Sequence, residues 1–164
     1  MSTNLGTILK ELESKLNGHT VVLGIGNILR GDDAFGSLLA QRIKDKVSLK
    51  VWDGASSPEN FLGKIVDEKP ATVLLVDAID FSEKPGAVRL FTKETLKTGN
   101  FFLTHNPSPR LIFDFLRAST MAKTYILAVQ PKSIGLGNEM STEVEQRLEE
   151  LTRWFKTRYS NHVC

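Results

Sequence analysis

Cysteine is almost absent from this sequence. The single cysteine, Cys164, allows neither an internal disulfide nor a zinc site built from cysteine thiolates, so we expect a reducing, cytoplasmic environment. Long apolar runs are missing too, because the longest strongly apolar stretch, residues 73–76, is far shorter than the ~18 residues of a membrane span. The sequence therefore predicts a cytoplasmic protein that does not insert into a membrane.

An excess of one charge is also missing. The chain has 21 Lys and Arg against 19 Asp and Glu, with the two signs interleaved, and its net charge is +2. A basic block of the kind that binds nucleic acid or an anionic membrane is absent, so we expect no nucleic-acid partner. With 164 residues, 41% hydrophobic and 24% charged, the chain has the composition of a globular domain that can bury a full core. A monomer is expected to be sufficient.

Strand patterns and helix patterns alternate along the chain. Segments with amphipathic helical spacing separate the β-branched or apolar stretches, which predict strands at residues 19–24, 47–52, 72–76, 87–91 and 124–129. This alternation predicts an α/β fold, a three-layer sandwich with a mostly parallel (mixed) five-stranded sheet between helices. In such sheets, ligands bind outside the carboxyl ends of the strands.

We expect a single domain over residues 1–164, in which an additional amphipathic helix at residues 1–18 precedes an α/β core at residues 19–158. Two helix starts have the spacing of a capping box. One pairs Ser56 with Glu59, and the other pairs Thr142 with Glu145 in a long last helix that begins near Ser141. A further helix is predicted to open at residues 107–109.

The glycine-containing segment GIGNILRGDD, residues 24–33, follows a predicted strand and precedes a predicted helix. It lacks the third glycine of the dinucleotide-binding motif G-x-G-x-x-G, because Leu29 occupies that position, and no Gly-Lys-Ser/Thr follows to form a phosphate-binding P-loop. A tight strand-to-helix turn that needs two glycines is the plainer interpretation. The segment therefore does not predict a nucleotide site.

Carboxylates collect where the predicted strands end. Asp32 and Asp33 follow the first strand and Asp53 the second, while Asp77 and Asp80 follow the third. Because the carboxyl ends of parallel strands share one edge of a sheet, these residues predict an acidic rim that suits a cation and repels phosphate. The alternative for Asp32, Asp33 and Asp77 is capping of the helix or turn that follows.

His105 adds an imidazole just ahead of a predicted helix, although a lone histidine is more often structural than functional. Asp33, Asp77 and His105 each follow a separate strand, so all three can converge on one crevice. Two carboxylates and an imidazole with open coordination positions suit a divalent first-row metal. The lack of cysteine ligands disfavours a structural zinc site, and the lack of an H-E-x-x-H motif disfavours a conventional zinc protease.

Taken together, these motifs resemble those of the maturation endopeptidases of [NiFe]-hydrogenases. The blocks that carry the resemblance are GIGNILRGDDAFG at residues 24–36, VDAID at residues 76–80 followed by Pro85-Gly86, THN at residues 104–106, and Gln130-Pro131. The segment DGASSPEN at residues 53–60 is similar to the branch of that family that serves membrane-bound, hydrogen-evolving hydrogenases.

The resemblance implies a specific reaction. An endopeptidase of this family removes the C-terminal extension from the precursor of the large hydrogenase subunit after nickel has been inserted. It implies that Asp33, Asp77 and His105 contact the nickel and form the catalytic site, with Asp32 and Asp80 as supporting or capping residues. The nickel is carried by the substrate, and no permanently bound metal is expected. The implied enzyme is a nickel-dependent endopeptidase of aspartic or metallo type.

Two other functions would use the same residues. A nickel-binding assembly factor would escort the large-subunit precursor without hydrolysing it. An ordinary α/β metallohydrolase would hold a metal of its own. The three hypotheses differ in whether the extension is removed and in whether a stoichiometric metal ion survives dialysis of the purified protein.

Overall fold

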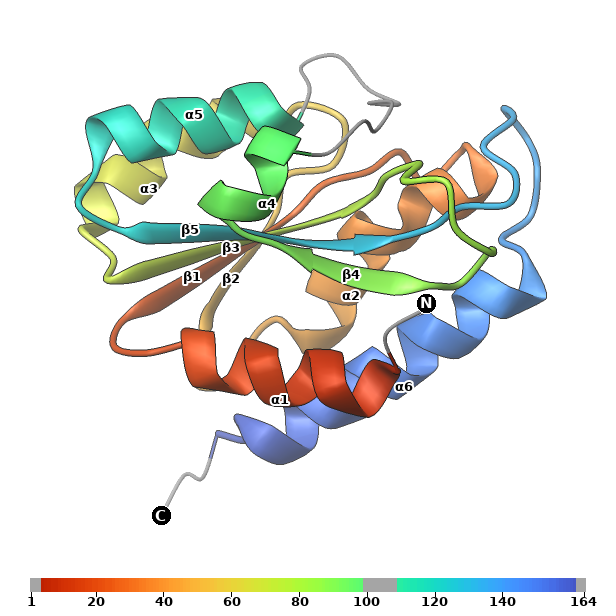
Figure 1. Cartoon of the computed structure of the whole chain (residues 1–164), viewed down its shortest axis with the longest axis horizontal. Coiled ribbons are helices and arrows are strands. Elements are labelled where there is room, and N and C mark those ends of the chain that lie inside the picture. The colour runs from red at the N-terminus through yellow and green to blue at the C-terminus, as the bar shows by residue number, and fades with distance from the viewer. Residues whose placement is uncertain (1–3, 99–108, 162–164) are drawn as a thin grey trace.

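The computed structural model describes residues 4–98 and 109–161. Its strands are β1 (Thr20–Gly24), β2 (Lys50–Asp53), β3 (Thr72–Ala78), β4 (Val88–Phe91) and β5 (Lys123–Val129). They form one five-stranded sheet in the order β2-β1-β3-β5-β4, in which only the β4–β5 pair is antiparallel (Figure 1). The predicted α/β fold with a mostly parallel sheet is confirmed.

Helices cover both faces of this sheet (Figure 1). The helices are α1 (Leu5–Lys15), α2 (Phe35–Ile43), α3 (Leu62–Glu68), α4 (Lys93–Thr98), α5 (Pro109–Ser119) and α6 (Thr142–Arg158), with short 3₁₀ helices η1 (Gly31–Ala34) and η2 (Pro58–Phe61). Buried side chains of α1, α2 and α6 share one apolar cluster. Those of α3, α4 and α5 share a second cluster on the opposite face.

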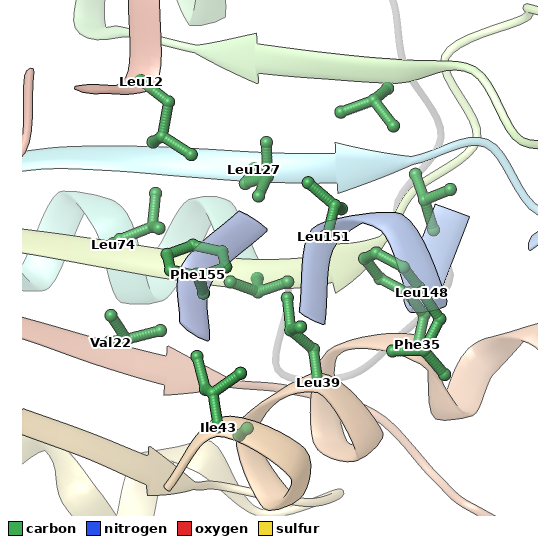
Figure 2. Close-up of a cluster of buried hydrophobic side chains, with 14 of the residues drawn as sticks. Leu12, Val22, Phe35, Leu39, Ile43, Leu74, Leu127, Leu148, Leu151 and Phe155 are labelled. Atoms are coloured by element: carbon green, nitrogen blue, oxygen red, sulfur yellow. The ribbon is translucent and has the colours of Figure 1, made fainter. Parts of the chain in front are cut away.

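The first cluster joins the two ends of the chain. Figure 2 shows Leu12 of α1 and Phe155 of α6 over the central strands, where they lie near Leu74 and Leu127. All four side chains are essentially inaccessible to solvent. Burying a leucine or phenylalanine contributes roughly 1.5–3 kcal/mol each, so α1 is part of the core-covering layer.

Backbone contact places α2 directly on the sheet. A Cβ atom at Gly36 would lie 2.1 Å from the Val76 carbonyl oxygen and 2.3 Å from that of Ile25. A Cβ atom at Gly24 would lie 2.2 Å from the Gly36 carbonyl oxygen. These two glycines therefore allow the helix to approach the carboxyl ends of β1 and β3, and they fix the position of the acidic pair that precedes α2.

The two predicted capping boxes do not form, although the last helix begins where it was predicted. The helix predicted to be capped by Ser56 begins instead as the 3₁₀ helix η2, whose N-cap is Ser57. No side-chain hydrogen bond caps η2. The last helix begins directly after Ser141, but Ser141 and not Thr142 is its N-cap, and the Ser141 hydroxyl donates to Asp32 instead of capping the helix. A capping box cannot be predicted from local sequence when the hydroxyl forms its hydrogen bond with a residue far away in the chain.

Other differences reflect local polarity and edge position. Strand β2 begins at Lys50, because Val47 makes only an isolated bridge to Ser160. Helix α4 is too short and polar to give a periodic pattern, and the sequence did not predict it. The start predicted for the helix at residues 107–109 lies partly outside the described residues. Within residues 4–98 and 109–161, no helix combines the length and apolar character needed to cross a bilayer.

Candidate active site

Asp77 lies within strand β3, not after it. Strand β3 extends to Ala78, and Asp77 pairs with Ala128 of β5 in the parallel ladder. Side chains alternate between the faces of a strand, so Asp77 shares its face with Val73 and Leu75, which pack against α3 and α5. The carboxylate is completely buried, and one of its oxygens accepts a 2.8 Å hydrogen bond from the Ala78 N–H.

Asp33 reaches the same edge of the sheet from β1. The chain leaves β1 at Gly24, and residues 25–30 lead into η1, which carries Asp33. This side chain is also fully buried, and its Oδ2 accepts a hydrogen bond from the Asn27 N–H at 3.2 Å. The turn that begins the glycine-containing segment therefore folds back onto the carboxylate that ends it.

The two carboxylates interact electrostatically. Burial raises the pKa of Asp77 well above its ordinary value of 3.8, the negative charge of Asp33 raises that pKa further, and the hydrogen bond from Ala78 lowers it. Two buried acids in one place disfavour two negative charges, so protonation of Asp77 is favoured when no cation is near. A bound cation would reverse this preference. Buried, coupled carboxylates with a perturbed pKa are common at catalytic and cation-binding sites.

Asp32 is the other half of the acidic pair, and it does not share this environment. Although it too is fully buried, its oxygens accept hydrogen bonds from Lys132 N–H, Ser133 N–H, Ser141 N–H and the Ser141 hydroxyl, at 2.7–3.0 Å. It therefore caps no helix of its own. It anchors a segment about one hundred residues away in sequence.

Asp53 and Asp80 are likewise held by protein donors. Asp53 Oδ1 accepts a 2.7 Å hydrogen bond from the Ser37 hydroxyl, and its Oδ2 accepts one from Gln41 Nε2 at 2.8 Å. Asp80 Oδ1 accepts hydrogen bonds from the Ser82 N–H and from Gln130 Nε2. The idea of a continuous acidic rim is therefore too broad, because Asp32, Asp53 and Asp80 each have structural partners.

Gln130 is a supporting residue whose task the sequence did not indicate. Its Oε1 accepts hydrogen bonds from the backbone N–H groups of Phe81 and Glu83 at 2.8 and 3.2 Å. With its Nε2 donating to Asp80, it fixes the segment that follows β3. In the sequence, the only indication of this role is a glutamine directly after a predicted strand. Its partners could not be predicted, because Phe81 is 49 residues away in the chain.

His105, the third predicted site residue, lies outside the described residues. Within residues 4–98 and 109–161, no group of three or more His, Cys, Asp or Glu side chains could hold a metal ion. The structure therefore brings together two of the three predicted residues, Asp33 and Asp77. Their oxygens are the type of ligand that hard and borderline divalent ions accept.

Comparison with known proteins identifies the family to which this arrangement belongs. The family model described as hydrogenase maturation protease matches residues 34–155. The chain belongs to the hydrogenase maturation protease family. The resemblance inferred from the sequence motifs is thereby confirmed, and the family is one of proteases.

Individual relatives of the family agree with this assignment. The hydrogenase 3 maturation protease of Escherichia coli (strain K12) is 30% identical over 131 residues, which cover 79% of this chain and 83% of the relative. The crystal structure of the [NiFe] hydrogenase maturation protease HycI from Thermococcus kodakarensis KOD1 superposes with a TM-score of 0.79 at 33% identity, covering 90% of this chain and 97% of that one. The endopeptidase HycI from Escherichia coli gives 0.70 at 27% identity, covering 85% and 90%.

Proposed function

We propose that this chain is the endopeptidase that removes the C-terminal extension from the large-subunit precursor of a [NiFe]-hydrogenase, and that it acts only on precursor already loaded with nickel. The observation that carries the proposal is the pair of buried carboxylates, Asp33 and Asp77, which meet at the carboxyl edge of the sheet in a member of a protease family. His105 is the third proposed contact to the nickel.

The chemistry of the two acids suits a metal that arrives with the substrate. Carboxylate oxygens are harder ligands than thiolates, so Asp33 and Asp77 would contact nickel held by substrate thiolates without extracting it. An incoming divalent ion would also stabilise the ionised form of Asp77, which burial and Asp33 disfavour. In this proposal the site becomes fully charged only when a loaded precursor is in place.

Nickel in that position would polarise the scissile carbonyl or an attacking water, as divalent ions do in hydrolytic sites. The chain's own residues supply orientation: Asn27 N–H holds Asp33, and Ala78 N–H holds Asp77. Both acids are carried by backbone close to the strand ends, so their separation is fixed by the sheet and by the contact of Gly36 with Val76. A cytoplasmic location, the absence of a permanent metal and a monomeric state stay predictions.

The decisive experiment is incubation of the purified protein with nickel-loaded and nickel-free precursor, followed by mass spectrometry of the large subunit. Loss of the extension only from loaded precursor is expected, and equal processing of both forms would contradict nickel gating. Asp77→Ala and His105→Ala should abolish cleavage. Asp67→Asn, which changes an exposed carboxylate on α3, should cleave normally.

The same measurement separates the alternatives that share these residues. An escort factor would bind the precursor and leave its extension attached. A conventional metallohydrolase would retain a stoichiometric metal ion after dialysis and would cleave nickel-free precursor. Either result would replace the proposed function.

A further inference from the structure

Three large apolar side chains lie exposed on two loops, one of which leads directly into the helix η1 that carries Asp33. Ile28, Leu29 and Leu136 are 57%, 63% and 70% accessible to solvent. They come from two loops that are distant in sequence, and the Gly137 N–H donates a 2.8 Å hydrogen bond to the Leu29 carbonyl, which joins the loops. We call these three residues the apolar loop surface.

Asp32 joins the two loops below this surface. Its carboxylate accepts hydrogen bonds from three backbone N–H groups and one hydroxyl of residues 132–141, and its own N–H donates to the Ser133 carbonyl at 2.8 Å. Gly31 makes the approach possible, because its φ is +56° and a Cβ atom there would lie 2.6 Å from the Ser133 carbonyl oxygen. A buried carboxylate with this many donors fixes its partners firmly.

The apolar loop surface is connected to the candidate site through the backbone of residues 27–33. Ile28 and Leu29 lie between Asn27, whose N–H donates to Asp33, and the anchor Asp32, which directly precedes Asp33 in η1. A substrate segment that extends from Asp33 along this loop therefore meets apolar side chains. Exposed leucine and isoleucine side chains gathered on two fixed loops are typical of a binding surface.

We propose that the apolar loop surface binds an apolar stretch of the precursor next to the cleaved bond, and that Asp32 is the positioning residue that holds this surface in place. The proposal rests on the proposed function, since it names where that substrate docks. Three partly exposed side chains offer far less than the ~800 Å² per partner of a stable protein interface. Their size therefore fits a short peptide segment better than a second copy of the chain.

The surface is tested by steady-state cleavage of nickel-loaded precursor with Leu29→Ser and Leu136→Ser. Loss of one buried leucine contact corresponds to a rise in KM of roughly 10- to 100-fold, with kcat unchanged. Because both leucines are exposed, neither substitution should lower the thermal midpoint of unfolding. Met121→Ser is the matched control, since Met121 is fully exposed just ahead of β5, at the opposite edge of the sheet.

The outcomes separate the two proposals. If wild-type protein cleaves the loaded precursor and the KM of Leu136→Ser is unchanged, the docking proposal is wrong while the proposed function stands. If wild-type protein does not cleave at all, the proposed function fails, and titration of uncleaved precursor still measures whether Leu136→Ser weakens binding. If sizing shows a wild-type dimer that Leu136→Ser dissociates, the surface binds a second copy instead.

The positioning role of Asp32 is tested by the KM and kcat of its variants, because a loss of stability alone would not distinguish it from a purely structural role. Asp32→Asn places an amide among four donors and should raise KM more than it lowers kcat. Adding Leu136→Ser to Asp32→Asn should cause little further rise in KM, because the surface is already displaced. Additive effects of the two substitutions would overturn the positioning role. If Asp32→Asn does not fold, Ser141→Ala removes only the hydroxyl donor and is used in the same double-mutant cycle.

Discussion

Asp77 is an ionisable residue in an environment that disfavours its charged form. It sits in a strand whose seven residues are all buried, among apolar side chains that favour a neutral group. Burial and the charge of Asp33 both raise the pKa of its carboxyl group. Stability alone would not select a carboxylate at this position, because a buried charge is costly. A role in function explains a carboxyl group at this position.

Replacement of this carboxyl should therefore stabilise the fold while it abolishes the proposed activity. In Asp77→Asn, the new amide retains an oxygen that accepts the Ala78 N–H but carries no charge. Burial and the charge of Asp33 raise the pKa of the carboxyl group that is replaced, so this substitution should raise the free energy of unfolding at pH 7. Urea denaturation followed by circular dichroism measures this change.

The stability gained by Asp77→Asn should depend on pH. The folded protein binds a proton at Asp77 more tightly than the unfolded chain does, so wild-type stability falls as pH rises from 3.8 through the raised pKa. Below pH 3.8 the carboxyl is protonated in both states, and the stability gained by Asp77→Asn should vanish. A gain that is the same at pH 3.5 and pH 7 would contradict this explanation.

At the scale of single elements, the packing of α2 decides where the acidic pair lies. The helix rests on β1 and β3 through Gly36, with no side chain between the backbones. Any Cβ atom there must displace the helix from the Val76 and Ile25 carbonyl groups. Because Asp33 lies three residues earlier, such a displacement would also separate it from Asp77.

Gly36→Ala should consequently be strongly destabilising, by roughly 3 kcal/mol or more, as overpacking against a rigid backbone is. The matched control is Gly63→Ala in α3, where no atom lies within 4 Å of the added Cβ. Alanine is favoured over glycine in a helix by up to about 1 kcal/mol, so this variant should be slightly more stable than wild type. Thermal unfolding of both proteins checks the contrast, and equal effects would refute it.

At the scale of the whole molecule, the two apolar clusters lie on opposite faces of one sheet. The N-terminal helix α1 and the C-terminal helix α6 complete the cover of one face. Leu12 of α1 is completely buried in that cluster. The N-terminal helix, predicted as an addition to the α/β core of a single domain, is packed into the same apolar cluster as α2 and α6.

Leu12→Ala should lower the free energy of unfolding of the entire protein by about 2–5 kcal/mol, the usual cost of a cavity in a core. Leu9→Ala, one turn away and only partly buried, should cost clearly less. Chemical denaturation measures both. A loss confined to the helical signal of α1, with the rest of the transition unchanged, would show that the helix folds independently.

The prediction of a single domain has its own test, because the two tryptophans report on different faces. Trp52 packs against the cluster on the α3–α5 face, whereas Trp154 packs against the cluster on the α1–α6 face. Fluorescence of Trp52→Phe and Trp154→Phe should give denaturation curves that each agree with circular dichroism of the same variant, as two-state unfolding requires. A fluorescence transition at a different denaturant concentration from the dichroism transition would indicate two units.

The sequence by itself determined the α/β class, the five strands and the family, because these depend on local hydrophobic spacing and on short motifs such as GIGNILRGDDAFG at residues 24–36. It also placed Asp33 and Asp77 near strand ends. Such features are encoded within windows of a few residues, where the period of the apolar positions follows from backbone geometry.

Only the tertiary structure decided which of the five acids have which task. Asp32 and Asp33 are neighbours in sequence, yet Asp32 bonds to residues 132–141 while Asp33 raises the pKa of Asp77. Ser141 could not be recognised as a partner of Asp32, because the two are 109 residues apart. Burial, charge coupling and hydrogen-bond partners depend on which distant segments meet at the carboxyl edge of the sheet, and no local pattern specifies that.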